Sequence, residues 1–361
     1  MNNNKKTIAF LVPSLAPGGM ERVISLLANY FANFNNIEVH IILFGKSHII
    51  FYEINKNIIV HKPKIIRKNS ILLILSRLLF IRREVRKLKP DAILSFGIHW
   101  NNFVLLSLTG LSYPIIVSDR GSPVRKYLFI HRIMRRVLYK RAKWIIAQTN
   151  LSRNLLKEII PESKIKVIGN PVRLIKNENK NILRENIILS VGRLIASKHF
   201  DRLIYIFSRL IISDWKLIIV GGDSLKQNNF EKLQELIKEL KINNRVILEG
   251  EQKNVERYYL KSKIFAFTSS VEGFPNVIGE ALSAGLPVIS YDCIAGPSEM
   301  IEDGVNGFLV PVFNDEVFAQ KLQLLIDNES LRNQMAINAL KSIRKFDINK
   351  IGKEYLDFIL S

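Results

Sequence analysis

The sequence predicts an α/β protein that contains two Rossmann-like domains. The first reason is length, because 361 residues exceed what one ordinary hydrophobic core accommodates. The second is a repeated alternation of apolar strands and amphipathic helices, which is typical of parallel sheets covered on both faces. The third is that this alternation restarts after residue 181, so each series is expected to build its own sheet.

The first series begins near the amino terminus. Its strands are near-continuous apolar runs, and its helices carry apolar residues at helical spacing. The predicted strands span residues 7–14, 38–45, 91–97, 114–120 and 143–149, and the predicted helices span 20–34 and 71–89.

The second series follows the same plan. Its predicted strands span 186–193, 215–223, 245–250, 264–270 and 286–292, and its predicted helices span 200–211, 230–242 and 276–284. The last helix should end at Gly285, because a glycine with Pro287 just beyond is a usual C-terminal signal.

The two series suggest where the domains begin and end. We expect an N-terminal domain over 1–171, a C-terminal domain over 172–340, and a closing helix over 341–361 that packs back toward the first domain. The Lys- and Asn-rich run over 176–186 is predicted to be an exposed linker.

The net positive charge of the chain lies entirely in its first half. Residues 1–180 hold 31 Lys and Arg against 9 Asp and Glu, a net of +22, whereas residues 181–361 hold 22 against 23. The excess concentrates in residues 62–89 and 120–143, where bases alternate with apolar residues. Such a surface suits an anionic membrane or a nucleic acid.

The helix predicted over 71–89 is basic and amphipathic. We expect its apolar side to pack on the first sheet and its cations to face lipid, in the manner of helices that lie in the membrane interface. The cations gather toward its end, at Arg82, Arg83, Arg86 and Lys87.

Composition excludes other classes of protein. Charges break the longest apolar runs well before the roughly 18 residues that a spanning helix needs. The single cysteine, Cys293, rules out a disulfide within the chain and fits a reducing cytoplasm. We expect this thiol to be buried and inert.

In open parallel sheets, ligands bind at the carboxyl ends of strands, so binding residues are expected in the loops there. After the first strand, Gly18 and Gly19 allow backbone amides to approach an anion at a helix N-terminus. After the strand "NIILSVG", which ends at Gly192, come Arg193 and Lys198, two cations that can clamp a diphosphate. Each loop alone is also compatible with an ordinary surface turn.

Two carboxylates flank an apolar turn in "SSVEGFPNVIGEALSAGLPVIS", with seven residues between Glu272 and Glu280. A helix beginning near Asn276 would offer its first amides to a diphosphate. Carboxylates on either side can then accept hydrogen bonds from adjacent hydroxyls, Glu280 from a ribose and Glu272 from a sugar. The sequence has no D-x-D motif and no close His/Asp cluster suited to a divalent ion.

This stretch resembles the E-x7-E signature of retaining glycosyltransferases of the GT-B fold, in family four. "AGPSEMIEDGVNGFLV" is similar to the segment that follows it in that family, "VGRLIASKHFDRLI" to the donor-phosphate strand, and "SLAPGGMERVI" to the N-terminal Gly-rich loop. The resemblance covers most of the chain in the same order. It is strongest to enzymes that build O-antigen, capsule or lipid-linked oligosaccharides, and it implies two Rossmann-like domains that face each other across a cleft.

The resemblance also implies roles for single residues. Arg193 and Lys198 would bind the diphosphate and stabilise the leaving group, Glu280 would hold the ribose, and Glu272 would hold the donor sugar near the reacting carbon. No enzymic nucleophile is needed in the front-face mechanism usually proposed for this family. Further donor contacts are expected at Gly18, Gly19, Gly192, Phe274, Asn276 and Val277.

The sequence departs from the family pattern in two loops. Many relatives place a histidine after the strand that corresponds to "PIIVSDRG", where this chain has Arg120 beside Asp119. An arginine can bind a phosphate or a sugar carbonyl, but it cannot act as a neutral base. The second departure is "GGDS", from Gly221, where relatives often have G-x-G. His99 is a candidate acceptor contact, with a structural role as the alternative.

The predicted reaction is a retaining transfer of a hexosyl or N-acetylhexosaminyl unit from a nucleotide sugar to a lipid-linked saccharide. A UDP-sugar is the expected donor, with GDP-mannose as the alternative, and neither a cofactor nor a metal is expected. The enzyme is expected in the cytoplasm, peripheral on the inner membrane and bound to its anionic leaflet. A nucleotide-sugar epimerase of the same plan and a basic nucleic-acid-binding protein are the rival interpretations, and the second lacks any reading motif.

Overall fold

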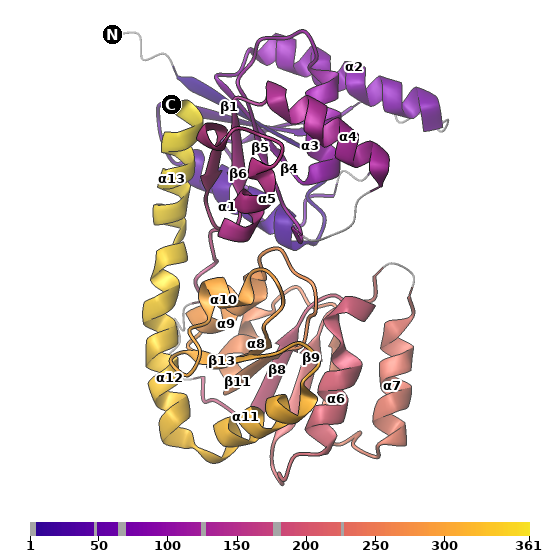
Figure 1. The fold of residues 1–361 in the computed structure, drawn as a ribbon, viewed down its shortest axis with the longest axis vertical. Coiled ribbons are helices and arrows are strands. Elements are labelled where there is room, and N and C mark those ends of the chain that lie inside the picture. The colour runs from indigo at the N-terminus through magenta and orange to yellow at the C-terminus, as the bar shows by residue number, and fades with distance from the viewer. Residues whose placement is uncertain (1–4, 47–48, 64–69, 124–127, 176–181, 225–226) are drawn as a thin grey trace. The chain divides into compact units, whose positions relative to one another are not determined.

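The computed structural model describes residues 5–46, 49–63, 70–123, 128–175, 182–224 and 227–361. The chain divides into two compact units, Met1–Pro171 with Phe346–Ser361, and Val172–Lys345 (Figure 1). Each unit contains a parallel sheet whose strands are connected by helices, which confirms the predicted α/β class with two Rossmann-like domains. Residues 64–69 and 124–127 of the two basic stretches, and residues 176–181 of the expected linker, lie outside the described residues.

The sheet of the first unit has seven strands in the order β3-β2-β1-β4-β5-β6-β7. β1 lies inside the sheet because it pairs in parallel with β2 on one side and with β4 on the other. The strands are β1 (Lys6–Val12), β2 (Ile37–Leu43), β3 (Ile59–His61), β4 (Ala92–Phe96), β5 (Ile115–Ser118), β6 (Trp144–Ala147) and β7 (Ile165–Val167).

The helices of this unit connect the strands and cover the sheet. They are α1 (Gly19–Phe31), α2 (Ser70–Leu88), α3 (Ile98–Ser107), α4 (Phe129–Leu138), α5 (Asn150–Lys157) and α13 (Ile348–Leu360). α13 packs on α1 at Gly352, where an added Cβ would lie 2.5 Å from the Tyr30 ring. A larger residue there would separate the two helices.

Helix α2 has the predicted extent, but its sides are arranged differently. Its buried apolar side chains are Leu73, Phe80, Ile81 and Val85, whereas much of its apolar surface is exposed, at Ile71, Leu72, Ile74, Leu75 and Leu79. Arg82 donates hydrogen bonds to the carbonyls of Ser107, at 3.2 Å, and Thr109, at 2.7 Å. The apolar side is therefore only partly buried and Arg82 ties α2 to the end of α3, whereas contact of the cations with lipid stays a prediction.

The sheet of the second unit has six parallel strands in the order β10-β9-β8-β11-β12-β13. The chain moves outward from β8 to β9 and β10, then returns to the other side of β8 with β11, so the strand order reverses between β8 and β11. The strands are β8 (Ile187–Val191), β9 (Lys216–Val220), β10 (Val246–Gly250), β11 (Ile264–Phe267), β12 (Val288–Tyr291) and β13 (Gly307–Val310).

The helices of the second unit bury their apolar sides against this sheet, around residues such as Leu203, Phe207 and Phe318. α9 ends as predicted, because Gly285 follows its last residues with a φ of 71° that favours glycine. The helices are α6 (Phe200–Ser208), α7 (Asn229–Glu239), α8 (Glu256–Lys261), α9 (Asn276–Ser283), α10 (Pro297–Met300), α11 (Asp315–Asp327) and α12 (Glu329–Ser342).

Candidate active site

The loops after β8 and β11 meet at the carboxyl edge of the second sheet, where the strand order reverses. Such a reversal leaves room between loops that diverge to opposite faces, and ligands of open α/β sheets bind there. Here the loops are joined directly. The Thr268 hydroxyl donates to the carbonyl of Lys198 at 2.9 Å, and the amide of Ser270 donates to the carbonyl of Ser197 at 3.0 Å.

These bonds bring Lys198 and Glu272 together from the two loops. The Nζ of Lys198 lies 2.6 Å from Oε1 of Glu272, and each side chain is only 15% exposed. Nζ also lies 4.7 Å from the centre of the Phe267 ring. Arg193, nearer the end of β8, is exposed. The expected clamp therefore consists of one cation already paired with a carboxylate and a second cation open to solvent.

The β8 loop is also fixed by a close approach to the β9 loop. Gly192 donates its amide to the carbonyl of Val220 at 2.9 Å. A Cβ added at Gly221 would lie 1.8 Å from the carbonyl oxygen of Gly192, so no other residue fits without moving that backbone. In the "GGDS" segment, Gly221 is therefore required, because its backbone contacts the Gly192 carbonyl at the start of the loop that carries Arg193.

His199 closes the Lys198 loop and begins α6 in a left-handed conformation, with a φ of 50°. Its Nε2 lies 2.8 Å from the Ser270 hydroxyl, and its ring packs edge-on against Phe313. Burial lowers the pKa of His199, although the carboxylates of Asp201 and Asp315 act in the opposite direction. The neutral ring is therefore favoured in the folded protein.

Glu280 lies one turn into α9 and is only 3% exposed. The Tyr259 hydroxyl, from α8, donates to its Oε2 at 3.0 Å and fixes the carboxylate. Burying a carboxylate is costly unless hydrogen bonds compensate, so such a group is commonly retained for binding. Glu272 and Glu280 thus occupy the loop before α9 and the second turn of α9, as the sequence predicted.

The turn between the two glutamates is tightly packed. Phe274 is buried, and a Cβ added at Gly296 would lie 2.3 Å from Cδ of Pro275. α9 begins with Asn276 and Val277, and Pro275 before them provides no side-chain cap. An anion at this position would meet the positive end of the helix dipole.

Cys293 follows β12 close to this edge and is buried. Burial and, to a smaller extent, the charge of Glu272 raise the pKa of its thiol to about 12. The thiol is therefore inert at neutral pH, as expected from the sequence.

The other candidate residues lie in the first unit. Gly18 and Gly19 are at the start of α1, where the Tyr52 hydroxyl accepts from the Gly18 amide at 3.0 Å and donates to the Gly18 carbonyl at 2.9 Å. A Cβ added at Gly18 would lie 2.2 Å from Oε2 of Glu21, which is the end of a flexible side chain. The position is crowded, and the backbone is extended rather than left-handed.

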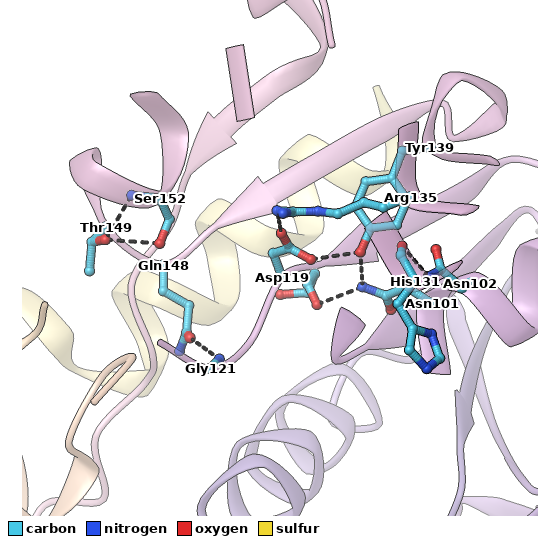
Figure 2. A network of polar contacts seen from close by, with 11 residues as sticks. Asn101, Asn102, Asp119, Gly121, His131, Arg135, Tyr139, Gln148, Thr149 and Ser152 are labelled. Carbon is cyan, nitrogen blue, oxygen red and sulfur yellow. Dashed lines mark hydrogen bonds and ion pairs between the residues drawn. The ribbon is translucent and has the colours of Figure 1, made fainter. Parts of the chain in front are cut away.

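Asp119 ends β5 in a buried polar network (Figure 2). The Tyr139 hydroxyl donates to its Oδ1 at 2.6 Å, and Arg135 pairs with its Oδ2. Asn101 in turn donates to the Tyr139 oxygen at 3.0 Å and to the Ser118 carbonyl at 3.1 Å. Burial, then the charge of Asp119, raise the pKa of Tyr139, which therefore remains a donor.

Arg120, the next residue, is buried and holds three parts of the first unit together. Its Nε donates to the Ser118 hydroxyl at 2.9 Å, and its terminal nitrogens bond Asn170 and the Tyr355 hydroxyl of α13. Its guanidinium also lies 5.1 Å from the centre of the Phe96 ring. Burial lowers the pKa of Arg120. The arginine thus serves as a structural clamp, and contact of Asp119 or Arg120 with an acceptor stays a prediction.

His99 is exposed near the start of α3, and its ring lies edge-on to His131 with the ring centres 4.2 Å apart. Sequence reasoning noted Gly221 only as part of the "GGDS" departure, and it did not single out His131, Tyr139 or Tyr259. These residues depend on contacts between segments that are distant in sequence.

Neither a metal-binding cluster nor a membrane-spanning helix occurs among the described residues. Within the described ranges, no group of three or more His, Cys, Asp or Glu residues is arranged to hold a metal ion. None of the helices described is both long and apolar enough to cross a membrane.

Two family models match the chain in tandem. The model for Glycosyltransferase Family 4 covers residues 17–175, and the model for Glycosyl transferases group 1 covers residues 172–342. The chain belongs to the glycosyltransferases that these two models describe. The family resemblance inferred from the sequence is thereby confirmed.

Individual relatives match the glycosyltransferase along nearly its whole length. It is 28% identical to the amylovoran biosynthesis glycosyltransferase AmsD of Erwinia amylovora, over 95% of this chain and 96% of that protein. It is 26% identical, over 98% of both chains, to the Campylobacter jejuni GalNAc-α-(1→4)-GalNAc-α-(1→3)-diNAcBac-PP-undecaprenol α-1,4-N-acetyl-D-galactosaminyltransferase. Anabaena HepE, solved in complex with UDP, has the same fold, with a TM-score of 0.81 at 20% identity over 98% of this chain and 99% of HepE.

Proposed function

We propose that this glycosyltransferase moves a hexosyl or N-acetylhexosaminyl unit from a UDP-sugar to a saccharide carried on a lipid diphosphate, with retention of configuration. The observation that carries the proposal is the arrangement of Lys198, Glu272 and Glu280 around the start of α9. It combines cations, helix amides and two carboxylates, which are the groups that a diphosphate between a ribose and a sugar requires.

Different residues of the second unit then bind different parts of the donor. Arg193, Lys198 and the amides at the start of α9 bind the diphosphate, Glu280 binds the ribose hydroxyls, and Glu272 binds hydroxyls of the sugar. The Lys198–Glu272 ion pair, at 2.6 Å, keeps both charges compensated before the donor binds. A diphosphate gives Lys198 a stronger partner and releases Glu272 to the sugar. Gly192, Phe274, Asn276 and Val277 complete this site.

The reaction breaks the bond between the anomeric carbon and the β-phosphate oxygen. The acceptor hydroxyl forms the new bond on the same face of the sugar, and its proton passes to the departing phosphate oxygen. Negative charge grows on the diphosphate as this bond breaks, so fixed cations lower the barrier. The alpha linkage in the name of the C. jejuni relative supports retention, because UDP-hexoses carry an alpha anomeric bond.

The first unit is proposed to bind the acceptor at the membrane. Its candidate contacts are Asp119 and His99, with Arg120 holding the loop, whereas Gly18 and Gly19, at the start of α1, are proposed as donor contacts. The undecaprenol-linked acceptor named for the C. jejuni relative and the polysaccharide named for AmsD support a lipid-linked saccharide in surface polysaccharide synthesis. The UDP bound to HepE supports a uridine nucleotide.

The test is a panel of nucleotide sugars measured by calorimetry and by transfer to an undecaprenyl-diphosphate saccharide. We expect one UDP-sugar to bind and to be transferred. Glu280→Gln should weaken UDP binding about 10-fold, since it removes a charged hydrogen-bond acceptor but preserves the shape that Tyr259 contacts. Conversion of the donor in the absence of acceptor would favour an epimerase instead.

A further inference from the structure

Helix α4 turns its apolar side away from the unit that carries it. Phe129, Ile130, Ile133 and Val137 lie on one side of the helix, and they are 74, 56, 43 and 60% exposed. Leu128, just before the helix, is 71% exposed. No residue of α4 is buried, although the apolar side of a domain helix normally faces the core. We refer to these five residues as the apolar stripe.

The opposite side of α4 fixes this orientation through polar contacts. Arg135 pairs with the buried Asp119 at the end of β5. Asn102 of α3 donates to the carbonyl of His131 at 3.3 Å (Figure 2). The His131 ring also packs edge-on against His99. A rotation of α4 that buried the apolar stripe would break these contacts and leave Asp119 without its cation. The polar contacts of α4 therefore fix the apolar stripe in its outward orientation.

Helix α2 exposes apolar side chains in the same unit. Ile74 and Leu75 are each 51% exposed and Leu79 is 58% exposed. α3 packs against both α2 and α4, so the two exposed apolar rows belong to one region of the unit (Figure 1). Large exposed apolar patches are uncommon on monomers and mark docking surfaces for a protein or a membrane, so the exposed side chains of these two helices make this region a candidate.

Charge favours the membrane. Arg132, Arg136 and Lys140 are exposed on or just beyond α4. The first 180 residues hold 31 Lys and Arg against 9 Asp and Glu, so the region is strongly positive. A second copy would bring like charges together around the apolar stripe, whereas an anionic bilayer offers phosphates around an apolar interior.

We propose that the apolar stripe inserts into the surface of an anionic bilayer, with Arg132 and Arg136 on lipid phosphates, so that α4 docks the first unit on the membrane. The inference rests on the proposed function in one respect, namely that the acceptor is carried on a lipid. Insertion makes docking partly resistant to salt, because apolar contacts persist when charges are screened. The Arg135–Asp119 pair then joins the docked helix directly to the end of β5, where the acceptor is proposed to bind.

The experiment is co-sedimentation of the full chain with vesicles of phosphatidylglycerol and phosphatidylethanolamine, or of phosphatidylcholine alone, across a salt series. Phe129→Ser combined with Ile133→Ser should weaken binding to the anionic vesicles about 10-fold or more. Ile211→Ser is the matched control, because Ile211 is apolar and 89% exposed but belongs to the second unit. It should bind as the wild type does. Arg132→Gln with Arg136→Gln should weaken binding mainly at low salt.

The outcomes separate this proposal from the proposed function. Equal vesicle binding by the wild type and the stripe variant, or no binding by a folded wild type, would overturn docking. A wild-type dimer that the stripe variant converts to a monomer, with no vesicle binding, would assign the stripe to a second copy. Vesicle binding by a protein that neither binds UDP nor transfers a sugar would uphold docking and overturn the proposed function. Thermal unfolding of each variant checks that its fold is intact, and Val137→Ser replaces any variant that fails.

Discussion

At the scale of single residues, the site combines charges that are already compensated. Lys198 is paired with Glu272, and the buried Glu280 accepts from Tyr259. Pairing of this kind keeps a site folded in the absence of its charged ligand, because an unpaired buried charge would lower the stability of the folded protein. The sequence predicted where the glutamates and the cations lie, because the strands before them are easily recognised, and their contact with a donor stays a prediction. It did not predict Tyr259, whose contact with Glu280 depends on how α8 packs.

The first prediction concerns the cations. Lys198→Ala and Arg193→Ala should each lower kcat/KM on the order of 10²-fold, because each removes a donor to charge that develops on the leaving diphosphate. Lys253→Ala is the control, since Lys253 is an exposed lysine on another loop of the same unit. Steady-state kinetics with a UDP-sugar measure the effect. Unchanged kinetics in both variants, with the fold intact, would remove these residues from the site.

The second prediction concerns pH. The pKa of His199 is lowered by burial, so folding favours the neutral ring. The contribution to stability is complete above the ordinary value near 6.5 and is lost as the pH falls toward the lowered value. His199→Asn should reduce this acid sensitivity, because asparagine tolerates the left-handed φ of 50° and does not titrate. Urea unfolding between pH 7 and pH 5 measures it, and an equal loss of stability in both proteins would refute the assignment.

At the scale of elements, prediction from sequence succeeded where one periodicity dominated. Strands such as β1, β8 and β11 were predicted because their residues are apolar on both sides, as a covered parallel sheet requires. α3 and α4 were not predicted. α3 buries the polar residues Asn101 and Asn102, so it lacks the pattern of an ordinary surface helix, whereas α4 has that pattern in its sequence and differs only in exposing its apolar side.

The close approach of the β8 and β9 loops gives the third prediction. Gly221→Ala should destabilise the protein and weaken UDP binding, because the new Cβ would lie 1.8 Å from the Gly192 carbonyl and displace the loop that carries Arg193. Gly304→Ala is the matched control. Gly304 also has a positive φ, 75°, but it faces open space before β13, so it should cost only about 1–2 kcal/mol. Thermal unfolding and UDP titration test the pair, and equal effects of the two substitutions would contradict the argument.

At the scale of the whole molecule, the two halves differ in charge as their proposed partners differ. The strongly basic first half is assigned to a lipid-linked acceptor and an anionic membrane, and the nearly neutral second half to a soluble nucleotide sugar. The sequence predicted this division from charge alone. It did not predict that the docking surface would be apolar as well, because whether apolar residues of α2 and α4 face inward or outward is decided by packing.

Metal removal gives the fourth prediction, and it also concerns the whole enzyme. We expect EDTA to leave the transfer rate largely unchanged, because the sequence has no D-x-D motif and Arg193 and Lys198 are proposed to neutralise the diphosphate. The control is a parallel assay with added manganese. An enzyme that EDTA inactivates and manganese restores would show that a metal carries this charge instead.

The central claim is a retaining transfer from a UDP-sugar, and the configuration of the product tests it most directly. The measurement is the proton NMR coupling between H1 and H2 of the transferred sugar, after reaction of a UDP-α-hexose with the lipid-linked acceptor. The account predicts the small coupling of an alpha linkage in a gluco- or galacto-configured sugar. The large coupling of a beta linkage would contradict it, because inversion requires a base opposite the leaving group, a role that the proposal assigns to no residue.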